Sequence, residues 1–271
     1  MSFVDKLRTI QEKHDSWLCV GLDPTPDMLP EGVSVLDFSR NIVNATAAYA
    51  CAFKLNLAFY LAYGAEGIAA LQKTVAHVPD DIPVILDAKF GDISYTAEHY
   101  ARAAFEQIGA DAVTVTPYVG MDAVTPLLEQ YPDRMVFVLV RSANTTGNDF
   151  QHWPNDRAPL YRYVTGQLNT LGRQYPNQLG VLAGATHAPD LINIRSWAPS
   201  LTFLIPGIGV QEGDLDIAIE HGVSLSSTGP IIAVTRSIIY AGSDGDYAAA
   251  ARDAAKLWRQ RIHETRDRYY D

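Results

Sequence analysis

The sequence is short of cysteine, of basic residues and of long apolar runs. Its two cysteines, Cys19 and Cys51, are too few for a disulfide framework, and both lie in apolar stretches typical of buried thiols in a reducing compartment. No apolar run approaches the roughly 18 residues that span a bilayer. Residues 1–6 do not begin a signal peptide, in which a basic segment precedes an apolar one. We therefore expect a cytoplasmic protein with no membrane partner.

Basic residues are outnumbered, since 31 acidic and 21 basic side chains give a formal net charge of −10. This balance argues against nucleic acid or an anionic membrane as the main partner. A small anionic ligand would have to be held by a few cations gathered at one place. Hydrophobic residues make up 48% of the chain, which is enough to fill a core and excludes wholesale disorder.

The 271 residues do contain a recurring alternation of apolar, β-rich segments with helical patterns, such as residues 96–108. Eight such units of about 30 residues predict an α/β fold, a (β/α)8 TIM barrel, forming a single domain over residues 1–271. Six units would have predicted a doubly wound sheet instead. A long alanine-rich helix is expected at about 246–268, packed against the barrel. The expected strands are residues 18–22, 52–55, 84–88, 112–116, 135–140, 180–183, 202–205 and 231–234.

Charged residues stand where the expected second and third strands end. Asp87 and Lys89 are two residues apart, so both side chains point to one face, the barrel mouth in the expected register. Lys54 lies on the neighbouring strand, and Asp92 follows the end of the third strand. Buried ions are costly unless paired, so we expect opposite charges in contact here. The alternative is a salt-bridge cluster that only fixes the register.

A second signal follows the last two strands. Gly207 and Gly209 come after the seventh strand, where glycine lets backbone N–H groups approach an anion. Arg236 ends the eighth strand and has a guanidinium suited to bidentate contact with a phosphate. Barrels of this type often bind phosphate with these two loops, so we expect a phosphate site here.

These motifs resemble the orotidine 5′-monophosphate decarboxylase family, in its longer bacterial subgroup (type 2). The segment DAKFGDI at 87–93 resembles the family signature Asp-x-Lys-x-x-Asp, and VGLDP, FKLNLAFY, TAEHY and PGIGVQ follow the family's order and spacing. The resemblance covers nearly the whole chain. It implies decarboxylation of orotidine 5′-monophosphate to uridine 5′-monophosphate in pyrimidine biosynthesis, with no cofactor and no metal.

The resemblance also implies roles for residues. A charged tetrad is expected from Lys54, Asp87, Lys89 and Asp92, with Lys89 protonating C6 and Asp92 supplied by the other subunit of a homodimer. Loop 211–216 is the expected lid. Asp23 is expected to contact the ribose, and Gln211 with Arg236 to hold the phosphate. The full set of expected substrate-binding residues is Asp23, Asn56, Ile93, Thr96, Ser142, Asn144, Pro206, Gly207, Gly209, Gln211, Thr235 and Arg236.

One departure from the family pattern bears on the substrate. Ala143 stands where the subgroup has a serine that contacts the pyrimidine amide edge, so backbone N–H groups, Ser142 or Asn144 would serve instead. An enzyme for a modified pyrimidine nucleotide is therefore an alternative. A metal-dependent sugar-phosphate relative would carry glutamate where Lys54 repels a cation. A non-catalytic nucleotide-binding relative would have lost a tetrad member, and none is lost.

Overall fold

Eight parallel strands close into a barrel in the order of the sequence, as the alternating pattern predicts. The computed structural model describes residues 1–225 and 228–270. Each strand pairs with the next, and β8 pairs with β1. The strands are β1 (Leu18–Gly21), β2 (Ala52–Asn56), β3 (Val84–Phe90), β4 (Ala112–Val115), β5 (Met135–Arg141), β6 (Leu179–Ala183), β7 (Thr202–Pro206) and β8 (Ile231–Val234).

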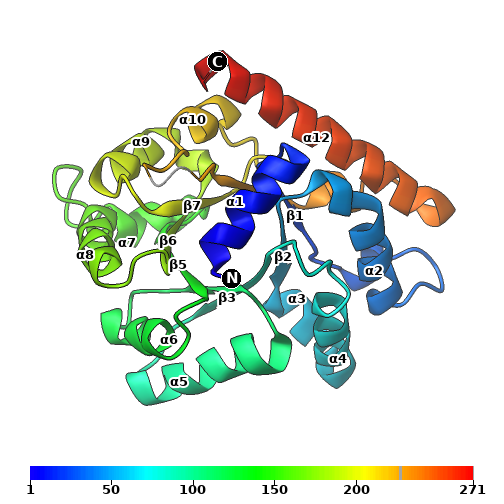
Figure 1. Ribbon diagram of the computed structural model, residues 1–271, viewed down its shortest axis with the longest axis horizontal. Helices are drawn as coiled ribbons and strands as arrows, with labels where there is room; N and C mark the ends of the chain where they lie inside the picture. Colours follow the sequence, from blue (N-terminus) through cyan, green and yellow to red (C-terminus); the bar gives the residue numbers. More distant parts are fainter. Residues whose placement is uncertain (226–227, 271) are drawn as a thin grey trace.

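Helices form an outer ring around the barrel (Figure 1). The expected helix at 96–108 begins earlier, at Ser94, and its second half is a π-helical turn over Ala103–Ile108. No described helix is long and apolar enough to cross a membrane. The helices are α1 (Phe3–His14), α2 (Val35–Thr46), α3 (Leu57–Leu61), α4 (Gly64–Val75), α5 (Ser94–Arg102), α6 (Thr125–Gln130), α7 (Asn148–Gln151), α8 (Leu160–Gln174), α9 (Ala188–Trp197), α10 (Leu215–Glu220), α11 (Arg236–Ile239) and α12 (Tyr247–Tyr270).

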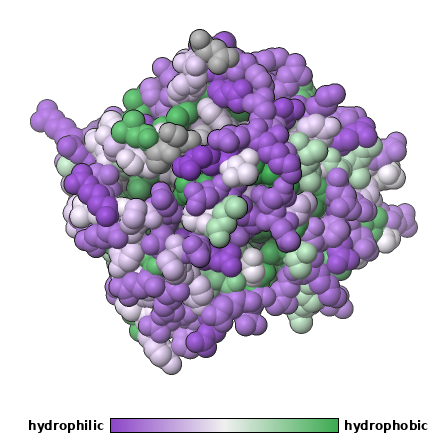
Figure 2. Space-filling view, viewed as in Figure 1, coloured by the Kyte–Doolittle hydropathy of each residue, from purple (hydrophilic) through white to green (hydrophobic). Residues whose placement is uncertain are grey.

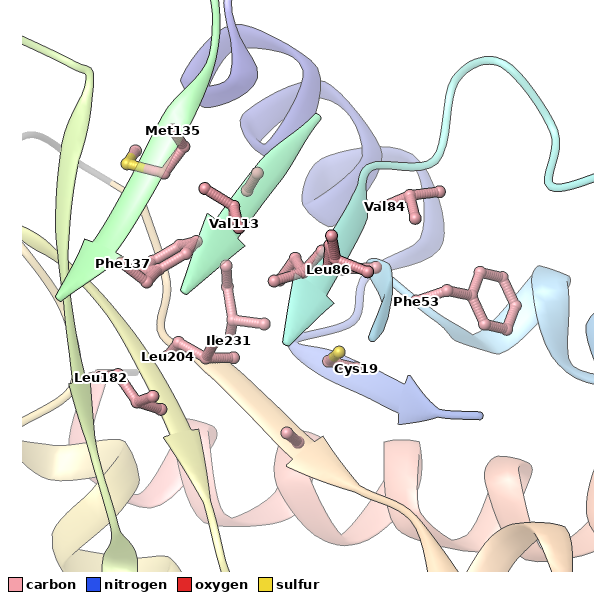
Figure 3. Close-up of a cluster of buried hydrophobic side chains, with 14 of the residues drawn as sticks. Cys19, Phe53, Val84, Leu86, Val113, Met135, Phe137, Leu182, Leu204 and Ile231 are labelled. Atoms are coloured by element: carbon pink, nitrogen blue, oxygen red, sulfur yellow. The ribbon is translucent and has the colours of Figure 1, made fainter. Parts of the chain in front are cut away.

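Side chains from the strands fill the barrel, which is therefore a core and not a pore. Figure 3 shows Phe137, Leu204 and Ile231 among these side chains, and all three are fully buried. Gly180 on β6 makes room for the Phe137 ring, because a β-carbon at position 180 would lie 2.5 Å from a ring carbon. The middle of the barrel is therefore apolar.

Helix α1, which the sequence patterns did not single out, covers the end of the barrel where the strands begin (Figure 1). The Ser2 hydroxyl caps it by accepting from the Asp5 N–H, and Phe3 packs edge-on against Phe137 at 5.7 Å between ring centres. The Lys6 ammonium bonds to Asp111, which stands immediately before β4. The surface on this side is mostly hydrophilic (Figure 2). This end of the barrel is closed.

The long C-terminal helix α12 packs along α2, α10 and α11. Tyr247, Ala251, Ala255 and Ile262, which are spaced along one face of the helix, are buried. The helix extends to Tyr270, two residues beyond the expected end.

Candidate active site

A cavity of about 540 Å³ opens at the end of the barrel where the strands finish. This is the end at which enzymes of this architecture carry their sites. Loops after the strands leave the cavity open, in contrast to the end that α1 covers. The expected site residues that line it are Asp23, Lys54, Asn56, Asp87, Lys89, Ser142, Asn144, Pro206, Gly207, Gly209, Gln211, Thr235 and Arg236.

The carboxylate of Asp87 bridges two ammonium groups at the floor of this cavity. Its Oδ2 accepts from Lys54 Nζ at 3.0 Å, and its Oδ1 accepts from Lys89 Nζ at 2.6 Å. Asp23 lies 3.8 Å from the same Lys54 ammonium. The side chain of Lys54 is 6% exposed, whereas that of Lys89 is 43% exposed. Of the two ammonium groups, that of Lys89 is therefore the more accessible to a ligand.

These contacts fix the ionisation of the buried pair. Burial alone would raise the pKa of Asp87, but the ammonium groups of Lys54 and Lys89 hold it well below its usual value. Burial alone would lower the pKa of Lys54, and the carboxylates of Asp23 and Asp87 hold it above its usual value. Nearby Cys19 is inert, because burial raises its thiol pKa to about 12. Asp87 and Lys54 are thus both charged at neutral pH.

Lys89 adopts an uncommon backbone conformation. Its φ is +49°, in the left-handed region that costs a residue with a β-carbon about 1–3 kcal/mol. The β3–β4 pairing shifts register at the same point, between Leu86 and Phe90. Thr114 on β4 faces this irregularity, and its hydroxyl bonds to both Lys89 and Asp87. The backbone strain therefore lies at Lys89, the more exposed lysine of the site. Strained backbone of this kind clusters at functional sites.

Arg141, at the end of β5, organises one wall of the cavity and is 1% exposed. Its Nε donates to Asp190 at 2.7 Å, and its other nitrogens donate to Gln151 and Asn148 of α7. Gln151 also accepts from the backbone N–H of Ser142 and donates to the Ser142 hydroxyl. The Ser142 hydroxyl is thereby turned toward α7.

Ala143 and Asn144 continue this wall. Ala143 packs against Gly184, where a β-carbon would lie 3.0 Å from the Ala143 backbone nitrogen. Asn144 lines the cavity with an exposed side chain. The wall therefore offers backbone groups and the Asn144 amide to a ligand.

The opposite wall combines the loops after β7 and β8. Gly207 has φ +98°, a conformation that glycine adopts without strain, and its carbonyl accepts from the Gly213 N–H at 2.9 Å. The loop thus turns back on itself beside Gln211, and exposed Arg236 stands across from it. An anion is the ligand that such a wall suits.

Three expected site residues lie outside the cavity. Asp92, Ile93 and Thr96 stand at the start of α5 and are not among the residues that line it. Asp92 accepts from the Ile93 N–H, and the Ile93 side chain is 65% exposed. Within one chain, the structure does not bring these residues to Lys89.

The sequence patterns missed several residues of the site. Arg141 follows a strand end, so the rule that found Asp87 and Lys89 would have found it too. Thr114 carries no charge, and nothing in its neighbourhood in the sequence marks it. The other lining residues outside the expected set are Thr25, Met28, Phe59, Leu139, Ala143, Leu182, Val210, Ala233 and Tyr240. Across the described part of the chain, no group of three or more His, Cys, Asp or Glu side chains is arranged to hold a metal ion.

Comparison with known proteins gives one family. Residues 16–253 match the profile of the orotidine 5′-phosphate decarboxylase / HUMPS family. Orotidine 5′-phosphate decarboxylase from Thermomicrobium roseum is 44% identical, over 98% of this chain and 96% of its own. The enzyme of that name from Dehalococcoides mccartyi is 40% identical, over 99% and 100%. The crystal structure of a putative orotidine-monophosphate-decarboxylase from Toxoplasma gondii superposes with a TM-score of 0.91 at 34% identity, over 99% of this chain and 98% of that one.

Proposed function

This chain belongs to the orotidine 5′-phosphate decarboxylase family, and we propose how its residues convert orotidine 5′-monophosphate to uridine 5′-monophosphate in pyrimidine biosynthesis. The observation that carries the mechanism is the Asp87 carboxylate, held between Lys54 and Lys89 at the cavity floor. In this proposal the tetrad is Lys54, Asp87, Lys89 and Asp92. Lys89 faces the reacting carbon.

The reaction requires a cation beside one carbon of the base. The bond between C6 and the carboxylate breaks, carbon dioxide leaves, and the electron pair stays on C6 with little resonance relief. The Lys89 ammonium stabilises this developing carbanion and then donates its proton to C6. Asp87 holds Lys89 in place, and solvent returns the proton. This route uses only groups of the protein, which is why we propose no cofactor and no metal.

The phosphate is a part of the substrate that binds to the protein but takes no part in the reaction. We assign it to Gln211 and Arg236, with the backbone N–H groups near Gly209 and Thr235, while Pro206 and Gly207 shape the loop. Binding energy from this wall is available to close loop 211–216 over the base. The local cations explain how a chain of net charge −10 holds a ligand that carries a phosphate and a carboxylate.

The sugar and the base occupy the space between the floor and the walls. Asp23 follows β1 and Asn56 ends β2, both beside Lys54, and the Asp23 Oδ1 accepts from the Asn56 N–H at 3.1 Å. We assign them, with Lys54, to the ribose. Ser142 and Asn144 line the wall assigned to the amide edge of the base. Since Ala143 offers no hydroxyl there, a modified pyrimidine nucleotide is the second candidate substrate.

We propose a homodimer in which each subunit completes the other's site. Asp92, Ile93 and Thr96 lie outside their own cavity, beside an exposed apolar surface. Tyr95, Tyr118, Val119 and Phe150 on that surface are 70%, 74%, 53% and 61% exposed, and Tyr118 packs edge-on against Phe150. An apolar patch of this kind marks an interface in a soluble protein. We place the dimer in the cytoplasm, where its two free cysteines stay reduced.

The substrate is tested by following absorbance loss with orotidine 5′-monophosphate, with and without EDTA. We expect turnover that EDTA leaves unchanged. Abolition by EDTA would favour a metal-dependent relative. Inactivity combined with tight binding of uridine 5′-monophosphate would favour the modified base.

The shared site is tested by mixing two inactive variants, Lys89→Ala and Asp92→Ala. Each heterodimer would contain one intact site, so part of the activity should return. Subunit exchange is verified separately with two differently tagged wild-type chains. Exchange without recovery of activity contradicts a site built from two subunits.

A further inference from the structure

The hydroxyl of Thr114 joins two members of the charged centre from the neighbouring strand. Its Oγ1 accepts from the Lys89 backbone N–H at 2.9 Å and donates to Asp87 Oδ1 at 2.9 Å. Thr114 is fully buried and does not line the cavity. It therefore acts on the site through other residues, without reaching a ligand itself.

The first of these bonds fills a gap in the sheet. Leu86 pairs with Val113, and Phe90 pairs with Val115, so three residues of β3 stand opposite Thr114 alone. Such a bulge leaves backbone groups without their usual partners. The Thr114 side chain supplies the acceptor that a strand backbone would normally offer to Lys89. Position 114 thus needs a side-chain oxygen.

The bulge is also where Lys89 adopts its left-handed conformation. Glycine would adopt that conformation at no cost, but the site needs the ammonium group of lysine. A strained conformation persists only when the surroundings hold it. The bond from the Lys89 N–H to Thr114 anchors the backbone from which the ammonium projects into the cavity.

The second bond fixes the carboxylate. Asp87 Oδ2 accepts from Lys54, and Oδ1 accepts from both Lys89 and Thr114. Because the hydroxyl proton goes to Asp87, the oxygen lone pairs of Thr114 are left for the Lys89 N–H. One hydroxyl therefore sets both the rotation of the carboxylate and the position of the strained residue.

We propose that Thr114 is a positioning residue that holds Lys89 and Asp87 in the geometry needed for proton transfer. The inference rests on the proposed function, because Lys89 must be the proton donor for its position to matter. A proton donor displaced by about 1 Å loses on the order of 10²-fold in rate. Ligand binding through the phosphate wall is remote from Thr114 and should not change.

The test compares variants that differ by the hydroxyl. Thr114→Val keeps the shape and removes both bonds, whereas Thr114→Ser keeps the oxygen. We expect kcat to fall about 10- to 100-fold in Thr114→Val, with KM and the Kd for uridine 5′-monophosphate within about twofold of wild type. Thr114→Ser should retain kcat within about fivefold of wild type. If the valine variant does not fold, Thr114→Ala against Thr114→Ser makes the same comparison.

The matched control is Thr202→Val. Thr202 is another buried strand threonine, on β7, and its hydroxyl contacts Thr228 at 3.2 Å, away from the cavity. The Thr202→Val variant should have a lower free energy of unfolding than wild type and an unchanged kcat. Equal kcat in wild type and Thr114→Val, or a serine variant as slow as the alanine variant, overturns the positioning role. An inactive wild-type enzyme instead overturns the proposed function, and this inference with it.

Discussion

Two aspartates, one at each end of the barrel, each bind two cations. Asp87, on β3, accepts from Lys54 and Lys89 at the open end. Asp111, immediately before β4, accepts from Lys6 at 2.8 Å and Arg134 at 3.0 Å at the end that α1 covers. The two clusters use similar chemistry in opposite settings.

The difference lies in what else each cluster bonds to. Asp111 Oδ2 also accepts from the Val84 N–H, and its backbone joins the starts of β3 and β5. It therefore ties α1 and three strands together. Asp87 sits beside a register shift, and one of its cations is 43% exposed on the cavity side. At the covered end the charges hold a helix and strands together, whereas at the open end the Lys89 ammonium stays available to a ligand.

This contrast separates stability from function within one architecture. A charge whose partners all belong to fixed elements contributes to the free energy of unfolding and offers nothing to a ligand. A charge held from one side, on a strained backbone, is available for chemistry. Substitutions at the two ends should therefore affect different measurements.

The sharpest test replaces each aspartate by asparagine. Asp87→Asn removes the charge that holds Lys89, so we expect kcat/KM to fall by roughly 10³-fold. Asp111→Asn should keep kcat and lower the free energy of unfolding by about 1–3 kcal/mol, since one neutral amide then faces two cations. Steady-state assays and urea unfolding measure the two effects. A loss of kcat in folded Asp111→Asn would break the separation of the two ends.

A second pair, Arg141→Lys and Arg195→Lys, extends the comparison to arginine. The Arg195 guanidinium donates to five backbone carbonyls, those of His221, Ala198, Pro199, Leu201 and Gly222, and it packs 3.5 Å from the centre of the Phe203 ring. Three of these carbonyls lie just before β7, at the covered end. Lysine cannot satisfy this planar arrangement, so Arg195→Lys should cost about 2–4 kcal/mol of stability and leave kcat unchanged.

Arg141→Lys belongs to the open end. A lysine would keep the ion pair with Asp190 and lose the contacts to Asn148 and to Gln151, the side chain that holds Ser142. We expect KM to rise about 10-fold, with a stability loss of about 1–2 kcal/mol. Unchanged KM in Arg141→Lys would remove Arg141 from the organisation of the cavity wall.

The barrel was predictable from the sequence, and the reason is periodicity. All eight expected strands are confirmed, and their ends differ by at most a few residues, as at β3, which continues to Phe90. Each strand is a buried apolar run bounded by turn residues, so the pattern is local. The π-helical turn at Ala103–Ile108 lies inside the expected helix 96–108, and Ala104 and Phe105 within it are buried.

The site was predictable where its residues carry charge and stand at strand ends, as Asp87 and Lys89 do. The bonds from Thr114 and the pairing of Arg141 with Asp190 were not predictable. Each joins residues far apart in the sequence, and each depends on a register or rotation that no local pattern encodes. Asp92 shows a further limit, because its proposed role needs a second chain. Its position in one subunit leaves that role a prediction.

The smallest expected effect concerns His152, in the segment that Arg141 organises. The side-chain contact with Asp156 raises the pKa of His152, burial opposes the rise, and Asp190 adds to it. A raised pKa means that the charged histidine stabilises the fold below its unfolded pKa of about 6.5, and that this contribution is lost as pH rises through the folded pKa. Because Asp156 is 90% exposed, we expect this contribution to be only about 0.5 kcal/mol.

This prediction is tested by urea unfolding at pH 5.5 and pH 8.5. The free energy of unfolding of the wild type should exceed that of His152→Gln only at the lower pH. The matched control is His77→Gln, because His77 bonds to the neutral Asn44 amide. An equal gap at both pH values would mean that His152 acts by packing against Tyr161 and not by its charge.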